Sequence, residues 1–270
     1  MSAILRPTKR AARRFLPRHL RVLISRVQHA RNRTTQAYGR IVPEWPTDAP
    51  DDPWADTVTT QRFVETPALD DVVGDLASPV VADNLEACRR TGLGTARLLD
   101  LGCATGDYCA YLRHFPGTRA WDYVGADINV AVIAHCRQRY PDFQFDVVSP
   151  EGQLPYADDE FDVAFVSGTL QYTNDWQGRL KDLKRIARRS VVLGRLPLWR
   201  RHPSAIALQI VQHSGGEEQH PVHLWNRAAL ESTLRDLGFG IEFCKPGFER
   251  LRVVDVAEQV VYHTYLLRRA

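Results

Sequence analysis

Two short segments of the chain combine residue types that suit the binding of a nucleoside. The first is LLDLGCATGDY over residues 98–108, where Gly102 and Gly106 follow an apolar run. Glycine carries no Cβ, so the backbone can turn sharply there and approach a ligand closely. The second is Asp127, which ends the segment 121–127 and lies 21 residues after Gly106. A carboxylate in this position accepts hydrogen bonds from the vicinal hydroxyls of a ribose, so the two segments together predict a nucleoside-containing cofactor.

The residues of the turn exclude two common nucleotide-binding motifs. A dinucleotide fingerprint requires GxGxxG, whereas positions 102, 104 and 107 hold Gly, Ala and Asp. An aspartate at the third position would face a pyrophosphate with the wrong charge. The chain also lacks the GK[ST] of a phosphate-binding loop, so it has no lysine for nucleoside triphosphate hydrolysis.

The elements that must position this turn alternate between short apolar runs and amphipathic stretches. We expect strands at residues 96–102, 121–127, 143–148, 161–168, 190–196, 239–245 and 258–267. We expect helices at residues 107–115, 130–140, 175–189 and 226–237. The pattern predicts an α/β fold: a doubly wound, mainly parallel, seven-stranded Rossmann-like sheet with an antiparallel C-terminal hairpin. Ligands bind such sheets at the carboxyl ends of the strands, beside the topological switch point.

The turn resembles the first motif of class I S-adenosylmethionine-dependent methyltransferases, in which an acidic residue precedes GxGxG. The matching residues are Asp100, Gly102, Ala104 and Gly106, with alanine in place of the middle glycine. The resemblance implies that the cofactor is S-adenosyl-L-methionine and that the turn, Cys103 included, binds it.

By the same resemblance, Asp100 faces the sulfonium and amino-acid end of the cofactor, while Asp127 and Ile128 hold the ribose. Ser167, at the end of the fourth expected strand, completes the cofactor set. Four residues are candidates for contact with the adenine: Asp146, Val147, Ser149 and Gln153. Among them we choose Val147.

Residues 160–245 resemble a narrower family of methyltransferases that is often associated with bacterial cell-surface polysaccharide genes. The matching segments are SGTLQY at residues 167–172 and RLP at residues 195–197. This resemblance implies methyl transfer to a small molecule or a glycan precursor, and we expect oxygen to be the methylated atom. Tyr172 and Arg195 are the substrate-binding candidates.

The segment 196–225 follows the fifth expected strand, so we expect it to form a loop that walls the acceptor site. It contains four histidines, of which His213 and His220 are the candidates for a general base. No metal site is expected, because the five cysteines form no CxxC pair and no carboxylate cluster accompanies the histidines.

Charge and composition divide the chain into two regions. Residues 1–40 hold 11 Lys/Arg and no acidic residue, whereas the remainder has 24 basic and 32 acidic residues. We expect residues 1–56 to form a basic amphipathic helix and a Pro/Trp-rich linker, and residues 57–270 to form the methyltransferase domain. The acidic body argues against nucleic acid as a partner. Trp45 and Trp54 in the linker either pack on the domain or cover a substrate cleft.

The basic helix leaves several interpretations open. Its apolar stripe either packs on the domain or, through residues 9–32, contacts an anionic membrane surface or a nucleic acid. In a eukaryotic source, an acid-free N-terminus of this kind is also typical of a mitochondrial transit peptide. No apolar run is long enough to span a membrane, so we expect a cytoplasmic protein, with contact at the inner face of the membrane as the alternative.

The sequence therefore predicts an S-adenosylmethionine-dependent methyltransferase that acts on a small molecule or a glycan precursor. Two alternatives differ from it in substrate or in activity. One is methylation of a lipid-linked acceptor at the membrane surface, and the other is a catalytically degenerate binding protein.

Overall fold

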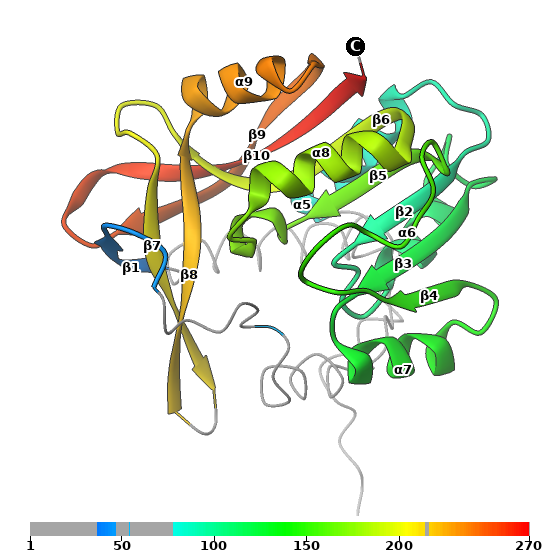
Figure 1. Cartoon of the computed structure of the whole chain (residues 1–270), viewed down its shortest axis with the longest axis horizontal. Helices are drawn as coiled ribbons and strands as arrows, with labels where there is room; N and C mark the ends of the chain where they lie inside the picture. Colours follow the sequence, from blue (N-terminus) through cyan, green and yellow to red (C-terminus); the bar gives the residue numbers. More distant parts are fainter. Residues whose placement is uncertain (1–36, 47–53, 55–77, 214–215, 270) are drawn as a thin grey trace, which may run out of the picture.

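The computed structural model describes residues 37–46, 54, 78–213 and 216–269 (Figure 1). The strands are β1 (Ala37–Val42), β2 (Arg97–Leu101), β3 (Asp122–Asp127), β4 (Gln144–Val147), β5 (Phe161–Ser167), β6 (Ala187–Trp199), β7 (Ala205–His213), β8 (Gly216–Asn226), β9 (Phe239–Val253) and β10 (Val256–Arg269). The helices are α5 (Pro79–Arg90), α6 (Asp107–His114), α7 (Val130–Arg139), α8 (Trp176–Ile186) and α9 (Arg227–Asp236), together with the 3₁₀ turn η2 (Leu170–Tyr172). No helix in this part of the chain is long and apolar enough to cross a membrane.

One half of the fold is a parallel sheet in the order β4–β3–β2–β5–β6. The chain moves from β2 outward through β3 to β4 and then returns to the other side of β2 with β5. The carboxyl ends of β2 and β5 therefore flank the topological switch point, where ligands bind in such sheets. The predicted alternation of strands and helices is confirmed over residues 97–186.

Two layers of helices cover the parallel sheet. Helices α5, α6 and α7 share one buried apolar cluster with Leu98 of β2, while α8 and α9 share a second cluster with Leu99. Neighbouring residues of a strand point to opposite faces, so this alternation shows that β2 is buried on both sides. Figure 1 shows α8 in front of β5 and β6.

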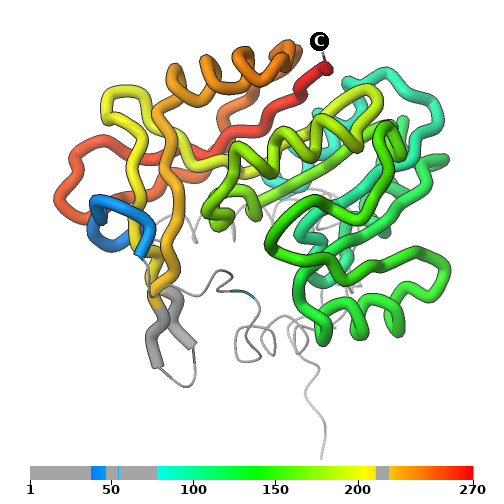
Figure 2. Tube along the Cα trace, in the orientation of Figure 1, coloured from blue at the N-terminus to red at the C-terminus, as the bar shows by residue number. Residues whose placement is uncertain are grey.

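The other half is a closed barrel of β6, β8, β7, β1, β9 and β10, because β10 pairs with β6 as well as with β9 (Figure 2). Its core includes Tyr38, Trp199, Val222, Leu251 and Tyr262. Strands β6, β9 and β10 have 13, 15 and 14 residues, so they are long enough to belong to both halves. This sharing joins the barrel to the parallel sheet.

The structure corrects three expectations. The expected count of seven strands is wrong, because the described residues alone form ten. The expected loop at 196–225 is instead the end of β6 followed by the antiparallel pair β7–β8. The first part of the expected linker belongs to β1, which pairs with β7 and β9. In each case, pairing with a strand distant in the sequence overrides weak local signals. The expected N-terminal helix lies outside the described residues, and the division into domains stays a prediction.

Candidate functional site

The turn after β2 wraps around the end of β3. The N–H groups of Gly102 and Cys103 both donate to the carbonyl oxygen of Ala126, at 2.7 and 3.0 Å. Gly102 has a φ of +76°, and a Cβ there would lie 2.2 Å from Thr169 Oγ1. Glycine is therefore required at this position for both its backbone conformation and its size. Ala104 also has a positive φ, of 46°.

Asp127 ends β3 with its carboxylate held by the backbone. Its Oδ2 accepts from Ala104 N at 3.0 Å, and its Oδ1 accepts from Asn129 N at 3.0 Å. Burial raises the pKa of Asp127, and these N–H donors oppose that effect because they stabilise the charged form. The carboxylate keeps further lone pairs for ribose hydroxyls.

A cavity of about 1070 Å³ runs from this turn to the barrel, and we call it the central cavity. Its cofactor end is formed by residues that follow β2, β3 and β4: Leu101, Gly102, Ala104, Asp127, Ile128, Asn129, Val132, Val148 and Ser149. Its barrel end is formed by residues of β5, η2 and the barrel strands, with the segments next to them: Ser167, Gly168, Gln171, Tyr172, Arg195, Gln209 and Tyr262.

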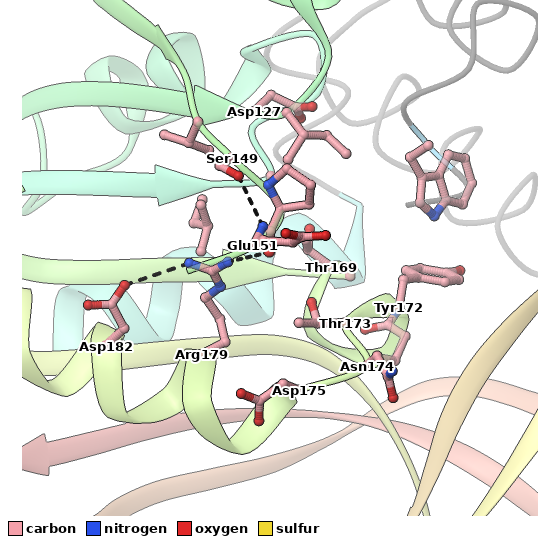
Figure 3. A pocket seen from close by; sticks show the side chains of 18 of the residues that line it. Asp127, Ser149, Glu151, Thr169, Tyr172, Thr173, Asn174, Asp175, Arg179 and Asp182 are labelled. Atoms are coloured by element: carbon pink, nitrogen blue, oxygen red, sulfur yellow. Dashed lines mark hydrogen bonds and ion pairs between the residues drawn. The ribbon is translucent and has the colours of Figure 1, made fainter. Parts of the chain in front are cut away.

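Helix α8 fixes the segment that follows β4 over the cofactor end (Figure 3). Arg179 Nη2 donates to the carbonyl oxygen of Pro150 at 2.7 Å, and Arg179 Nη1 lies 3.6 Å from Asp182 Oδ2. Asp182 in turn accepts from Leu154 N at 2.6 Å. Because its two ends are tied to one helix, this segment forms a fixed wall of the cavity.

The cofactor end fits S-adenosylmethionine. The Gly102 and Ala104 backbone lies open to the cavity, Asp127 offers a carboxylate for the ribose, and Ile128 and Val148 offer apolar surface for a purine. The structure thus brings five of the predicted cofactor residues to one cavity: Gly102, Ala104, Asp127, Ile128 and Ser167.

Four other predicted cofactor residues do not line the central cavity. Asp100 is 2% exposed and accepts from Tyr123 O–H at 2.7 Å on the opposite face of β2, where burial raises its pKa to about 7. Cys103 is 5% exposed and belongs to the apolar cluster that contains Leu98. A Cβ on Gly106 would lie 2.8 Å from Phe145 Cε1, so this glycine allows close packing. Val147 borders a separate, shallow pocket, while its neighbour Val148 lines the cavity.

Both predicted substrate residues lie at the barrel end. The Tyr172 hydroxyl donates to Gln209 Oε1 of β7, and burial raises the pKa of Tyr172. Arg195 has a φ of 56°, and its guanidinium lies 5.0 Å from the centre of the Tyr262 ring. A positive φ is uncommon for a side-chain-bearing residue, and such strained residues are enriched at functional sites.

Trp54 connects the two ends of the central cavity. Its carbonyl oxygen accepts from Asn129 Nδ2 at 3.0 Å at the cofactor end. Its indole lies edge-on to Tyr172, with ring centroids 5.2 Å apart, at the barrel end. The structure therefore places this tryptophan of the expected linker in the wall of the cleft.

The two predicted bases have different positions. His220 of β8 is 5% exposed and packs on the Trp54 ring with centroids 5.5 Å apart, but it is not part of the cavity wall. His213 ends β7, where it pairs with Gly216, and its side chain lies outside the described residues. No group of three or more His, Cys, Asp or Glu side chains in the described segments is arranged to hold a metal.

Gln209, Tyr262 and Asn84 were missed by the sequence analysis. Gln209 and Tyr262 come from strands that only the barrel brings to the cavity. Asn84 of α5 is fully buried and donates to Ser167 Oγ at 2.8 Å and to Tyr108 Oη at 2.6 Å. The sequence signal that could have identified Asn84 is a polar residue on the buried face of a predicted helix.

Comparison with protein families identifies a methyltransferase domain in the same part of the chain. A family model described as a methyltransferase domain matches residues 99–193, which include the turn, Asp127 and Ser167. A search of curated protein sequences gives no match to the chain.

Solved structures share the fold at low sequence identity. The CcbJ methyltransferase from Streptomyces caelestis has a TM-score of 0.54 at 15% identity, covering 82% of this chain and 99% of its own. The 1,6-didemethyltoxoflavin-N1-methyltransferase from Burkholderia thailandensis, solved with bound 1,6-didemethyltoxoflavin and S-adenosylhomocysteine, has a TM-score of 0.53 at 16% identity, covering 79% of this chain and 88% of its own. A methyltransferase from Aquifex aeolicus has a TM-score of 0.51 at 14% identity, covering 80% and 99%. With the family match and a cavity that fits the cofactor, the chain is an S-adenosylmethionine-dependent methyltransferase.

Proposed function

We propose that the protein transfers a methyl group to an oxygen atom of a small hydroxylated molecule or glycan precursor. The observation that carries this proposal is the continuity of one cavity of about 1070 Å³ from Asp127 to Gln209 and Tyr262. Pockets that enclose a single drug-sized ligand have volumes of about 300–1,000 Å³. The central cavity is therefore large enough for the cofactor and a small acceptor together.

The side chains at the barrel end support a hydroxylated acceptor. Ser167, Tyr172 and Gln209 present neutral hydroxyl and amide groups, and Trp54 adds a flat apolar surface. Such a mixture of aromatic faces and a few polar groups is typical of small-molecule sites. The resemblance of residues 160–245 to methyltransferases of polysaccharide gene clusters adds glycan precursors to the candidate acceptors.

Methyl transfer depends mainly on alignment of the acceptor oxygen with the methyl carbon. When bound, S-adenosylmethionine supplies an electrophilic methyl carbon: the acceptor oxygen bonds to it, the carbon–sulfur bond breaks, and the hydroxyl proton passes to a base or to water. Tyr172, whose pKa is raised by burial, keeps its proton and so positions the acceptor rather than deprotonating it. His213 and His220 stay the predicted bases.

Labelling a lysate of the source organism with methyl-tritiated S-adenosylmethionine tests the proposal. The lysate is then separated into small-molecule, lipid, polysaccharide, protein and nucleic-acid fractions, and Asp127→Ala protein serves as the inactive control. We expect Asp127-dependent label in the small-molecule or polysaccharide fraction. Label in lipid would instead favour the lipid-linked acceptor, and label in nucleic acid or protein would overturn the proposal.

Calorimetry with S-adenosylhomocysteine separates two explanations for a complete lack of label. Binding by the wild-type protein but not by Asp127→Ala would show an intact cofactor end without its acceptor. Absence of binding to the wild-type protein would favour the degenerate binding protein.

A further inference from the structure

We propose that the acceptor carries a carboxylate or phosphate group and that Arg195 binds this group at the barrel end of the central cavity. The inference rests on the proposed function, since it names the chemical class of the small-molecule acceptor. Within the described lining, Arg195 is the one charged residue that the barrel strands contribute, beside the neutral Gln209 and Tyr262.

The guanidinium of Arg195 is held in place next to the end of β5. A Cβ on Gly168 would lie in ordinary van der Waals contact with Arg195, 3.7 Å from Cδ and 3.8 Å from Nη1, so the arginine side chain lies directly beside this residue. The Tyr262 ring supports the guanidinium from the barrel side at 5.0 Å, a favourable cation–π distance. The positive φ of Arg195 is a strained conformation that the surrounding strands maintain.

The ion pair of Arg195 within the chain is incomplete. Its Nη2 lies 3.7 Å from Glu249 Oε2, which is longer than a hydrogen bond. Arg195 Nε and Glu249 Oε2 are both buried and have no hydrogen-bond partner among the described residues. A guanidinium has five donors, so contact with one distant carboxylate oxygen leaves most of its capacity for another anion.

A third polar atom at the same end is also unsatisfied. Gln171 is 2% exposed and borders the cavity, and its Oε1 has no hydrogen-bond partner in the described part of the chain. Buried polar groups without partners are uncommon, and they often mark places where a ligand or water completes the bonding. Arg195 and Gln171 together present a cation and a hydrogen-bond acceptor, as a hydroxy acid or a sugar phosphate requires.

Three other cations of the described residues line the cavity wall, and all of them belong to α8 rather than to the barrel strands: Arg179, Lys181 and Arg185. Lys181 is exposed. Arg179 and Arg185, at the cofactor end, both pair with Asp182 and also donate to backbone carbonyl groups. Arg179 Nη1 also has no hydrogen-bond partner in the described part of the chain, but the bond from Arg179 Nη2 to Pro150 fixes the segment that follows β4 and keeps this guanidinium at the cofactor end. Arg195 is therefore the guanidinium that the geometry assigns to the acceptor.

The charge of the labelled product tests this inference directly. Product from the small-molecule fraction is applied to an anion exchanger at pH 7, before and after treatment with alkaline phosphatase. We expect retention of the Asp127-dependent label, because methylation of a hydroxyl leaves the anionic group intact. Loss of retention after phosphatase identifies a phosphate monoester, and unchanged retention identifies a carboxylate or a phosphodiester. Label that passes through untreated would overturn the inference while leaving the proposed function standing.

Variants then test whether Arg195 binds the anion. With limiting small-molecule fraction as acceptor, we expect Arg195→Gln to lower the labelling rate about 10- to 100-fold, the range for loss of a charge-assisted hydrogen bond. Affinity for S-adenosylhomocysteine should stay within about twofold, which also shows that the variant folds. Arg195→Lys keeps the charge and should recover part of the rate. Exposed Arg119, outside the cavity wall, supplies the matched control Arg119→Gln.

A purely structural role for Arg195 predicts a different pattern. If the residue only pairs with Glu249, then Glu249→Gln should lower the labelling rate as much as Arg195→Gln does. If Arg195 binds the acceptor, Glu249→Gln should reduce the rate far less, because it removes a competing anion. Equal losses in the two variants, or a full rate in Arg195→Gln, would overturn the inference. Asp127-dependent label in the protein or nucleic-acid fraction, with none in the small-molecule or polysaccharide fraction, would instead refute the proposed function.

Discussion

The backbone N–H of Ala104 donates to Asp127 Oδ2 at 3.0 Å, which joins the turn after β2 to the end of β3. Asn129 N holds the other carboxylate oxygen at the same distance. Because both oxygens are fixed by the backbone, the carboxylate is oriented before a ribose reaches it. Such pre-organisation lowers the entropic cost of binding.

Replacing Asp127 should therefore weaken cofactor binding. We expect Asp127→Ala to raise the Kd for S-adenosylhomocysteine about 10- to 100-fold, because hydrogen bonds to a charged group are lost. Isothermal titration calorimetry measures this effect, and circular dichroism checks the fold. Asp142→Ala, at an exposed carboxylate outside the cavity wall, is the matched control. An unchanged Kd in Asp127→Ala would contradict the assignment of the ribose site.

Gly102→Ala should damage both stability and cofactor binding. The new Cβ would lie 2.2 Å from Thr169 Oγ1 in a residue with a φ of +76°. Gly92→Ala separates the two effects, because Gly92 has a φ of +74° and a Cβ added there would meet no atom within 4 Å. Urea denaturation should show a loss of about 1–2 kcal/mol for Gly92→Ala, from backbone strain alone. A larger loss, with weaker binding of S-adenosylhomocysteine, is expected only for Gly102→Ala.

Tyr172→Phe should affect the acceptor and spare the cofactor. The change removes the hydroxyl that donates to Gln209 but keeps the ring that packs on Trp54. We expect kcat/KM for the labelled acceptor to fall about 5- to 20-fold, the range for loss of one or two neutral hydrogen bonds. Tyr156→Phe, which removes a hydroxyl bonded to Asp146 outside the central cavity, is the comparison variant. Equal effects of the two changes would refute a specific role for Tyr172.

Asp100 should make the stability of the protein depend on pH. Burial raises its pKa from an ordinary value of 3.8 to about 7, so the folded state binds its proton more tightly than the unfolded state. The resulting stability is present below pH 4 and is lost as the pH rises to 7 and above. Asp100→Asn cannot ionise, so its unfolding free energy should lack this decline, which amounts to at most about 4 kcal/mol. Urea denaturation at pH 5 and pH 8 measures the difference, and parallel pH profiles would contradict the expected titration.

The cofactor end was predictable because its signals are local. Gly102, Asp127 and the apolar strands that carry them lie within about thirty residues, and each strand is followed by its own helix. The motif predicts that Asp100 faces the cofactor, but the structure places its side chain elsewhere. Asp100 alternates with Leu99 along β2, so it shares the face of Leu98 and meets Tyr123 instead of the cavity.

Tyr172 and Arg195 were predicted at the barrel end, but Gln209 and Tyr262 were not, since they reach the cavity only through long-range pairing. The hydroxyl groups of Tyr38 and Tyr262 are 2.8 Å apart although 224 positions separate them in the sequence. The alternation in β7 and β8 is interrupted by histidine and glutamine, which are equally typical of a polar loop. Only the closed ring of strands reveals that Gln209 borders a cavity.

The closed barrel also sets the order in which the two ends of the cavity form during synthesis of the chain. The cofactor end is built from β2 to α8, a contiguous stretch that is synthesised before β6 to β10 and makes contacts of short sequence separation. Tyr38 of β1 pairs with Val253 of β9 and β10 pairs with β6, so the ring of strands stays open until β10 has been added. A nascent chain that extends through α8 therefore contains the elements of the cofactor end, whereas the barrel end also requires the strands from β6 to β10.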